Sequence, residues 1–498
     1  MIPIRSEILC RRVSVCSLWF FFFSALLSGC AWLSPKQDKD AFVLNDADAR
    51  RAGALALYSK GLMLEGDEQK STNTNAVAKE ASVLAFRQAL QLEPDNRKAL
   101  AALVSSLTER ERYKEALQVL EGYLDRHPDD LEMRLEAARA AEAANEPDRA
   151  ASHCAAILAL QPDNRELAQA LVRLYFQSDQ TTRALRLCRD LYARFHDRES
   201  ASLPVQWAVY FSSEGRQPER AMDCLRLALT QRTNSAERAA LISLMAEDQM
   251  LLGQTNAAET SLLRAFRENP SSTTPILRLG TLWSRRADAT NTLARRAKGR
   301  GEKAETAQLM LAATQQALDN NTAAIITLRE FIDKRRSENR TPGESYYLWL
   351  CSLVEDQKKT GETVPLLREA LALYPASHEL KNFLAYLWAE QGSHLEEANR
   401  LVNEALAAEP ENAAYLDTKG WILFKSGRAY DALQFLLKAA DTDKDEPEIL
   451  DHAGDVLNAI GRESEAIIFW KRSLQLDPQP AVAEKLKKHG ATTQPKKP

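Results

Sequence analysis

A regular spacing of prolines constrains the fold of this chain more than any other feature. Pro94, Pro128 and Pro162 each follow an apolar run, precede polar residues and are separated by steps of 34 residues. Towards the C-terminus, Pro375 and Pro410 are 35 residues apart, and Pro478 lies 68 residues, or two periods, after Pro410. Self-similarity at a period of about 20–50 residues is typical of repeat architectures, in which each unit buries its apolar face against its neighbours. The chain is therefore expected to fold as a stack of similar units.

Each period contains two amphipathic helical patterns. In the last unit, Leu450, Gly454 and Leu457 share one helical face, and Ala466 and Trp470 form a second series after a Gly-Arg turn. Small residues recur where two helices must approach closely. The composition agrees, because Gly (18) and Pro (19) together make up only about 7% of the 498 residues, against about 12% in average proteins. The units are thus expected to be helical hairpins.

This combination of period, small residues and closing proline resembles the tetratricopeptide repeat, and the match covers most of residues 46–479. The resemblance implies an all-α fold, a right-handed superhelical solenoid of about eleven helix pairs. A capping helix is expected at Ala481 to His489, with Lys485, Lys487 and Lys488 facing water. The pattern is interrupted by a polar insert between Gly66 and Asn75, by extra residues between Ser284 and Asn321, and by a break at Thr341-Pro342-Gly343.

The predicted domain organisation follows from these interruptions. From residue 46 onward it consists of N-terminal repeats (46–283), a charged insertion within a repeat (284–321), C-terminal repeats (322–479) and a capping helix with a polar tail (480–498).

The N-terminus has the pattern of a targeting segment. Arg5, Arg11 and Arg12 precede an uncharged, largely apolar stretch from Val13 to Leu27, which has signal-peptide length and is short for a membrane span. It ends in Leu27-Ser28-Gly29-Cys30, which resembles a bacterial lipobox. The resemblance implies a lipoprotein signal peptide at residues 1–29 and a lipidated N-terminus with a short linker at residues 30–45. Cys30 would carry a fatty acid such as palmitate and anchor the chain in a bilayer. Ala31, where Asp would favour the inner membrane, implies the periplasmic side of the outer membrane. An ordinary signal peptide or an uncleaved anchor is the alternative.

Charge and motif content narrow the function classes. With 65 Lys and Arg against 69 Asp and Glu, the chain has no excess of cations for nucleic-acid binding. The sequence contains neither nucleotide-binding glycine motifs nor catalytic serine or zinc motifs, so no enzyme activity, metal or cofactor is predicted. The seven histidines are interpreted as scattered surface residues. Cys154, Cys188, Cys224 and Cys351 are interpreted as buried, unpaired side chains, because residues one repeat apart are too distant for a disulfide.

The candidate binding site is the concave groove that the resemblance implies along the first helix of each repeat. In the last three units the residues predicted to line it are Asn382, Tyr386, Asp417, Trp421, Phe424, Glu448, Asp451, Asp455 and Asn458. The Lys pattern with which chaperone-binding members of the family hold a terminal carboxylate is missing. Exposed aromatics among carboxylates would favour a cationic or hydroxyl-rich ligand. Alternatively, Trp421 packs against the neighbouring repeat and the acids are only solvated.

The leading hypothesis is a non-enzymatic scaffold for protein–protein interactions, tethered to the outer membrane and serving envelope assembly or export. Its partners would be envelope proteins or peptides bound in the groove, with the membrane contacted only through the lipid. The alternatives are a polysaccharide-binding lipoprotein of an exopolysaccharide secretion complex and a regulator of cell-wall synthesis, since acids interleaved with Tyr and Trp also suit a glycan.

Overall fold

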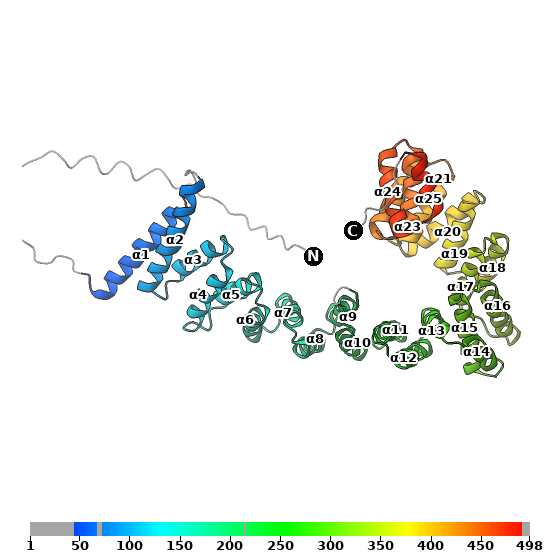
Figure 1. Ribbon diagram of the computed structural model, residues 1–498, viewed down its shortest axis with the longest axis horizontal. Helices are drawn as coiled ribbons and strands as arrows, with labels where there is room; N and C mark the ends of the chain where they lie inside the picture. Colours follow the sequence, from blue (N-terminus) through cyan, green and yellow to red (C-terminus); the bar gives the residue numbers. More distant parts are fainter. Residues whose placement is uncertain (1–43, 67–71, 214–215, 491–498) are drawn as a thin grey trace, which may run out of the picture. The chain divides into compact units, whose positions relative to one another are not determined.

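The computed structural model describes residues 44–66, 72–213 and 216–490, which form twenty-five α-helices and no strand (Figure 1). The predicted signal peptide and Cys30 lie outside the described residues. None of the described helices is both long enough and apolar enough to cross a membrane. The chain divides into two compact units, residues 1–178 and 179–498.

The first unit contains seven described helices, each packed against the next along the chain. They are α1 (Asp46–Glu65), α2 (Thr72–Leu92), α3 (Arg97–Thr108), α4 (Tyr113–Leu124), α5 (Leu131–Ala143), α6 (Pro147–Leu160) and α7 (Arg165–Gln177).

The second unit begins with α8 (Thr181–Phe195), α9 (Arg198–Ser213), α10 (Pro218–Thr230), α11 (Ser235–Leu251), α12 (Thr255–Glu268) and α13 (Thr274–Ser284). It continues with α14 (Ala289–Ala297), α15 (Glu302–Ala317), α16 (Asn321–Ser337), α17 (Glu344–Asp356), α18 (Thr360–Leu373) and α19 (His378–Glu390). The last helices are α20 (Leu395–Ala408), α21 (Ala413–Lys425), α22 (Ala429–Thr442), α23 (Pro447–Ala459), α24 (Glu463–Leu476) and α25 (Pro480–Lys488).

The repeated proline marks the end of one hairpin, and a residue two positions later caps the next helix. After Pro94, the side chain of Asn96 accepts a hydrogen bond from the backbone N–H of Ala99 (3.0 Å). Asp130 and Asn164 do the same for Met133 and Leu167, both at 3.1 Å. Such caps satisfy amides that a helix start leaves unpaired. The periodic motif therefore ends one helix and starts another, as the spacing predicts.

Small residues allow the helices of a pair to touch. A Cβ on Gly454 of α23 would lie 2.5 Å from the Trp470 ring of α24, and one on Gly420 of α21 would lie 2.6 Å from Leu436 of α22. Gly280 of α13 is tighter still, because its Cβ would lie 2.4 Å from the backbone carbonyl carbon of Ala313 in α15. A larger side chain at these positions would force the helices apart.

Residues 284–321, predicted as a charged insertion, contain α14 and α15 and contribute to the apolar core. Leu293 and Ala312 are fully buried in a cluster that continues into α16 and α17. α15 packs against α13, α14 and α16. The domain boundaries set from the sequence remain predictions.

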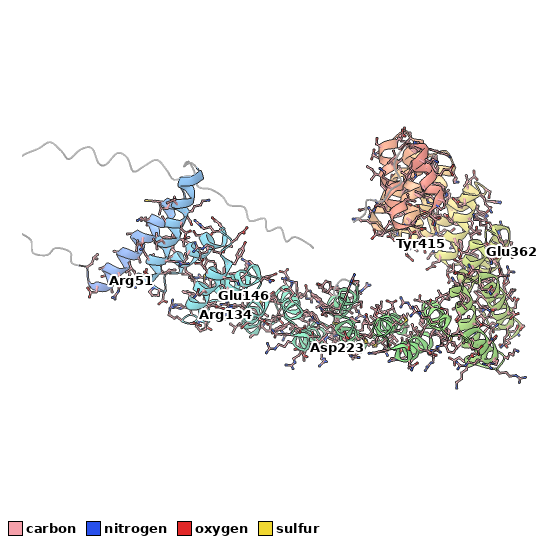
Figure 2. The ribbon with its side chains drawn as sticks, in the orientation of Figure 1. Arg51, Arg134, Glu146, Asp223, Glu362 and Tyr415 are labelled. Atoms are coloured by element: carbon pink, nitrogen blue, oxygen red, sulfur yellow. The ribbon has the colours of Figure 1, made fainter. Side chains whose placement is uncertain are left out.

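The C-terminal cap is confirmed by α25, which packs on α24 through Val482 and Leu486. Lys487 and Lys488 face water as expected, but Lys485 does not, and its contacts are described below. Figure 2 labels charged side chains of both units, among them Glu146 and Glu362. Glu146 forms an ion pair with Arg149 (2.6 Å), and Glu362 forms one with Arg329 (2.8 Å).

Candidate functional site on the first helices of the C-terminal repeats

The nine residues predicted to line the groove lie on α19, α21 and α23, the first helices of three successive hairpins. α21 packs against both α19 and α23. We call these nine residues the first-helix surface: Asn382, Tyr386, Asp417, Trp421, Phe424, Glu448, Asp451, Asp455 and Asn458. The structure therefore gathers them on neighbouring helices, but it exposes fewer of them than the sequence predicts.

Trp421 is the clearest correction, because only 6% of it is exposed. Its ring stacks on the imidazole of His452 in α23, with centroids 3.9 Å apart and planes 15° from parallel. The ammonium of Lys425 lies 4.6 Å from the ring centroid, and the indole N–H donates a hydrogen bond to Glu390 of α19. The expectation of an exposed ring is wrong, because the close approach of α23 covers it. The alternative that it packs against the next repeat is correct.

Asp417 is also buried, with 5% of it exposed, and it faces His452. The Nδ1 atom of His452 lies 2.9 and 3.0 Å from the two carboxylate oxygens of Asp417. Burial lowers the pKa of His452. The charge and hydrogen bond of Asp417, together with the charges of Glu448 and Asp451, outweigh this effect, so the pKa is raised overall. The arrangement is a buried carboxylate–imidazole pair joining two repeats.

His452 was missed by sequence reasoning, which interpreted it as a scattered surface residue. His153 was missed in the same way, because it too is buried, 3.4 Å from a carboxylate oxygen of Glu121. The available signal for His452 was its distance of 35 residues, one repeat plus one residue, from Asp417. Such a spacing places two side chains on adjoining first helices.

Tyr386 joins the network from α19. Its hydroxyl donates to the carboxylate of Glu448 in α23, across α21. Burial raises the pKa of Tyr386, and the negative charge of Glu448 raises it further. One hydrogen bond thus connects first helices that are two repeats apart.

The acids at the C-terminal end of the surface are matched by a cation that sequence reasoning placed in water. Lys485 of α25 lies 2.7 Å from carboxylate oxygens of both Asp451 and Asp455. Asp455 also accepts a hydrogen bond from Trp470 of α24 (3.1 Å). Burial raises the pKa of Asp451, against an opposing hydrogen bond from Lys485. The expectation that Lys485 faces water is wrong, because the capping helix places its ammonium against these two carboxylates.

Six residues of the first-helix surface are half-exposed: Tyr386, Asp451 and Asp455, whose partners are given above, and Asn382, Phe424 and Asn458. The Oδ1 atom of Asn382 is buried and has no hydrogen-bond partner among the described residues. Glu448 is exposed while it accepts the bond from Tyr386. These groups can offer amide, carboxylate and phenyl contacts to a partner. In the described ranges, no group of three or more His, Cys, Asp or Glu residues could hold a metal ion.

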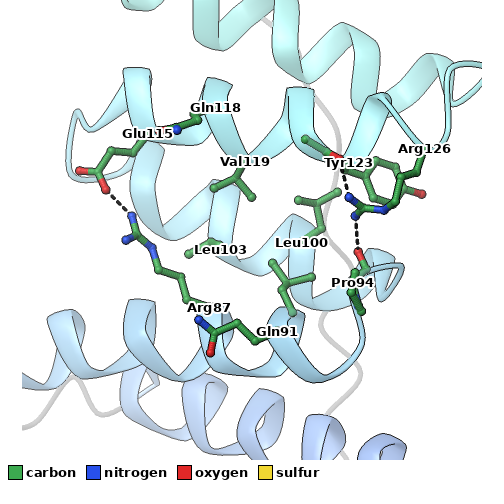
Figure 3. Close-up of a pocket in the computed structure, with 12 residues that line it drawn as sticks. Arg87, Gln91, Pro94, Leu100, Leu103, Glu115, Gln118, Val119, Tyr123 and Arg126 are labelled. Carbon is green, nitrogen blue, oxygen red and sulfur yellow. Dashed lines mark hydrogen bonds and ion pairs between the residues drawn. The ribbon is translucent and has the colours of Figure 1, made fainter. Parts of the chain in front are cut away.

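Apart from the first-helix surface, a hollow lies in the first unit, between α2, α3 and α4 (Figure 3). Its volume is about 450 Å³, and Leu100 and Leu103 contribute apolar lining. Arg87 is ion-paired with Glu115, and Arg126 donates hydrogen bonds to the carbonyls of Pro94 (3.0 Å) and Gly122 (2.6 Å). The cations around this hollow already have partners within the fold.

Comparison with known proteins agrees with the repeat geometry. Family models described as tetratricopeptide repeat match residues 80–130, 102–165 and 141–203. Residues 80–203 consist of tetratricopeptide repeats. Together with the helical hairpins that continue to α24, this match confirms the predicted all-α, tetratricopeptide-type fold. The four described cysteines are free and buried, as the repeat spacing predicts.

Two curated proteins show partial similarity to this chain. The TPR repeat-containing protein PA4667 of Pseudomonas aeruginosa is 27% identical over 156 residues, which cover 31% of this chain and 26% of that protein. Human tetratricopeptide repeat protein 7A is 28% identical over 134 residues, covering 27% of this chain and 16% of the human protein. The chain thus spans about a quarter and a sixth of the lengths of these relatives.

Solved structures with similar helix arrangements include yeast Tom70, at 15% identity and a TM-score of 0.36, covering 88% of this chain and 94% of Tom70. The APC/C hetero-tetramer Cut9-Hcn1 gives 13% identity and a TM-score of 0.37, covering 91% of this chain and 97% of the matched chain.

Proposed function

We propose that this chain is a non-enzymatic scaffold that holds partner proteins of the bacterial envelope, in an assembly or export complex. The observation that carries the proposal is the run of tetratricopeptide repeats at residues 80–203, continued by helical hairpins to α24. Stacked helical hairpins present long surfaces made of many helix faces, and repeat proteins use such surfaces to bind other proteins.

The half-exposed residues of the first-helix surface fit a protein partner better than a glycan. Sugar binding was suggested by the expected open face of Trp421. That ring is stacked on His452, and Lys425 lies over it, so it offers no flat platform. Phe424 and Asn458 are half-exposed and remain available for contacts with a peptide.

We further propose that the chain is anchored by lipid on Cys30 at the periplasmic side of the outer membrane. The support is the Leu27-Ser28-Gly29-Cys30 tetrapeptide after an apolar stretch. Acyl anchoring would leave the repeats in water next to the membrane.

The scaffold proposal is tested by crosslinking in intact cell envelopes, followed by affinity purification and mass spectrometry. We expect a small, reproducible set of envelope proteins joined to the repeats. Recovery of only the proteins that also crosslink to an unrelated lipoprotein of similar abundance would contradict it.

The anchor is tested by Cys30→Ser. We expect the variant protein to leave the membrane fraction or to accumulate as an uncleaved precursor. Cys16→Ser, which changes the same residue type inside the apolar stretch, is the matched control and should be processed normally. A normally processed, membrane-bound Cys30→Ser protein would refute lipid anchoring.

A further inference from the structure

A pocket in the second unit combines an apolar floor with a cationic rim. It lies between α12, α14 and α15 and has a volume of about 710 Å³, within the range of roughly 300–1,000 Å³ that is typical of ligand sites. Its floor includes Phe266 of α12, Leu293 of α14 and Met310 of α15, which all belong to the apolar core of this unit. We call it the basic pocket.

The rim carries Arg267 of α12, Arg296 of α14, Arg300 and Lys303, and all four are exposed. Among the described residues, none of the four has an ion pair or a side-chain hydrogen bond. Arg296 makes one ring contact, 5.1 Å from the centroid of Trp283.

Two acids also line the pocket, Glu259 and Glu302. Glu259 is already paired with Arg286, at 2.5 Å, and only Glu302 remains to oppose the four cations. The rim therefore keeps an excess of positive charge in a chain whose net charge is −4.

The backbone holds this rim in place. The turn between α14 and α15 contains Gly301, whose φ of +80° lies in the left-handed region that favours glycine. Arg300 precedes it, and Lys303 follows on the first turn of α15. Behind them, Glu305 of α15 pairs with Arg335 of α16 (2.7 Å), so that the helix is fixed on its other side.

We propose that the basic pocket binds an acidic peptide segment of a partner protein, with a large apolar side chain inserted into the floor and its carboxylates on the rim. Arg and Lys form their strongest hydrogen bonds with carboxylates. A flat membrane surface would reach the rim and leave the hollow unfilled. A nucleic-acid strand needs several aromatic faces for its bases, and Phe266 is the one aromatic residue among the described residues that line the pocket. This inference rests on the proposed scaffold function and locates one of its contacts.

The test uses the full chain in detergent and three fluorescein-labelled peptides, one of Glu and Leu, one with Lys for Glu and one with Ser for Leu. Fluorescence anisotropy should show saturable binding of the Glu/Leu peptide only. Binding should weaken as salt shortens the Debye length from about 10 Å at 0.1 M to about 3 Å at 1 M. Equal binding of the Glu/Ser peptide would overturn the proposal, because the apolar floor would then be unused.

Two pairs of substitutions separate the pocket from general charge. Arg296→Glu with Lys303→Glu should weaken binding about tenfold or more, since it reverses two rim charges. Arg285→Glu with Lys298→Glu makes the same change in net charge on exposed residues outside the pocket and should leave binding intact. Equal weakening by both pairs would overturn the proposal.

Filling the pocket gives a charge-neutral test. Thr306 of α15 lines the hollow, and Thr306→Trp should abolish binding without altering the rim. If this variant does not fold, the charge-reversed pair still decides, because its side chains are exposed. Binding of phosphatidylglycerol vesicles through the rim, with no binding of the Glu/Leu peptide, would replace the peptide site with a membrane contact.

The outcome is distinguishable from failure of the scaffold function. If envelope crosslinking recovers the same partners from the wild type and the rim-reversed pair, the scaffold stands and the basic pocket is refuted as a partner site. If crosslinking recovers no specific partner while the Glu/Leu peptide still binds, the scaffold function fails and the pocket chemistry stands.

Discussion

The first-helix surface and the basic pocket both gather charged side chains over apolar floors, yet their charges have different partners. On the first-helix surface, Asp417 faces His452, and Asp451 and Asp455 face Lys485. Around the basic pocket, four cations have no acidic partner among the described residues. Charges that pair inside the fold hold repeats together, whereas unpaired charges at a hollow remain available to a ligand. Exposure and pairing therefore distinguish a structural cluster from a binding site better than residue type does.

The largest expected effect that would test this comparison is that of Trp421→Ala. Because Trp421 is buried against His452, its removal should cost about 3–5 kcal/mol in the free energy of unfolding. In a stack of repeats the loss should be local, so hydrogen exchange should rise in α21 to α24 and stay unchanged in α9 to α12. Tyr430→Ala, at a ring that is 78% exposed, is the control and should change stability little. A Trp421→Ala protein as stable as the wild type would contradict the burial of this ring.

Lys485→Met should have the next largest effect, because it keeps the aliphatic stem and removes the charge that faces two carboxylates. Leaving Asp451 and Asp455 without this cation should cost about 1–3 kcal/mol, measured by urea unfolding. Lys487→Met on the same helix, where the side chain is exposed, should be close to neutral. Equal stability of the two variants would show that the cap cation is not needed.

The pH dependence of stability should report the buried pair. Because the pKa of His452 is raised in the fold, its contribution is fully present below the unfolded value of about 6.5 and is lost as pH rises through the raised folded value. Each unit of pKa difference corresponds to about 1.4 kcal/mol. Unfolding of the C-terminal repeats should therefore become easier from pH 6.5 upward. The raised pKa of Asp451 acts with the same sign, because its contribution is lost as pH rises above the ordinary Asp value of 3.8 and through the raised folded value.

Asp417→Asn should flatten this slope, because it removes the charge that holds the proton on His452. His489→Gln, at a half-exposed imidazole of the C-terminal cap, should leave the slope in place. An unchanged slope in Asp417→Asn would mean that another group titrates.

The smallest expected change in stability is that of the rim-reversed pair. Arg296→Glu with Lys303→Glu alters exposed side chains that stabilise no described ion pair, so the free energy of unfolding should stay within about 0.5 kcal/mol of the wild type. Thermal unfolding measures this directly. A large loss would show that these cations serve the fold, and the contrast between the two regions would disappear.

Much of the fold could be predicted because it depends on a periodicity that is visible in the local sequence. The helix pairs were predicted from the spacing of Pro94, Pro128 and Pro162 and from the small residues Gly420 and Gly454. In the structure the prolines mark the ends of hairpins, and the glycines lie where two paired helices touch. Residues 284–321 were harder to interpret, because α14 is short and Gly280 meets α15, outside the usual pairing in sequence order.

The positions of the nine predicted surface residues on adjoining helices could also be predicted, but their exposure could not. Whether Trp421 faces water depends on how closely α23 approaches, and that distance is set by side chains a repeat away. Lys485 lies 34 residues, one repeat, from Asp451, so the spacing places the two on adjoining helices, but the direction of the Lys485 side chain is set by tertiary packing. The basic pocket could not be predicted, because it depends on the geometry of the turn between α14 and α15. The number of charges in that segment gives no information about this turn.

The four buried cysteines provide a way to measure the local unfolding of individual hairpins. Burial raises the pKa of Cys154 to about 11 and the pKa values of Cys188 and Cys351 to about 12, and it also raises that of Cys224. Since the thiolate is the reactive form, native thiols should react slowly with alkylating reagents. They lie on α6, α8, α10 and α17, so the labelling rate of each would time the opening of its own hairpin. The unmodified protein thus contains four native thiols whose alkylation rates report local unfolding at four positions in the chain.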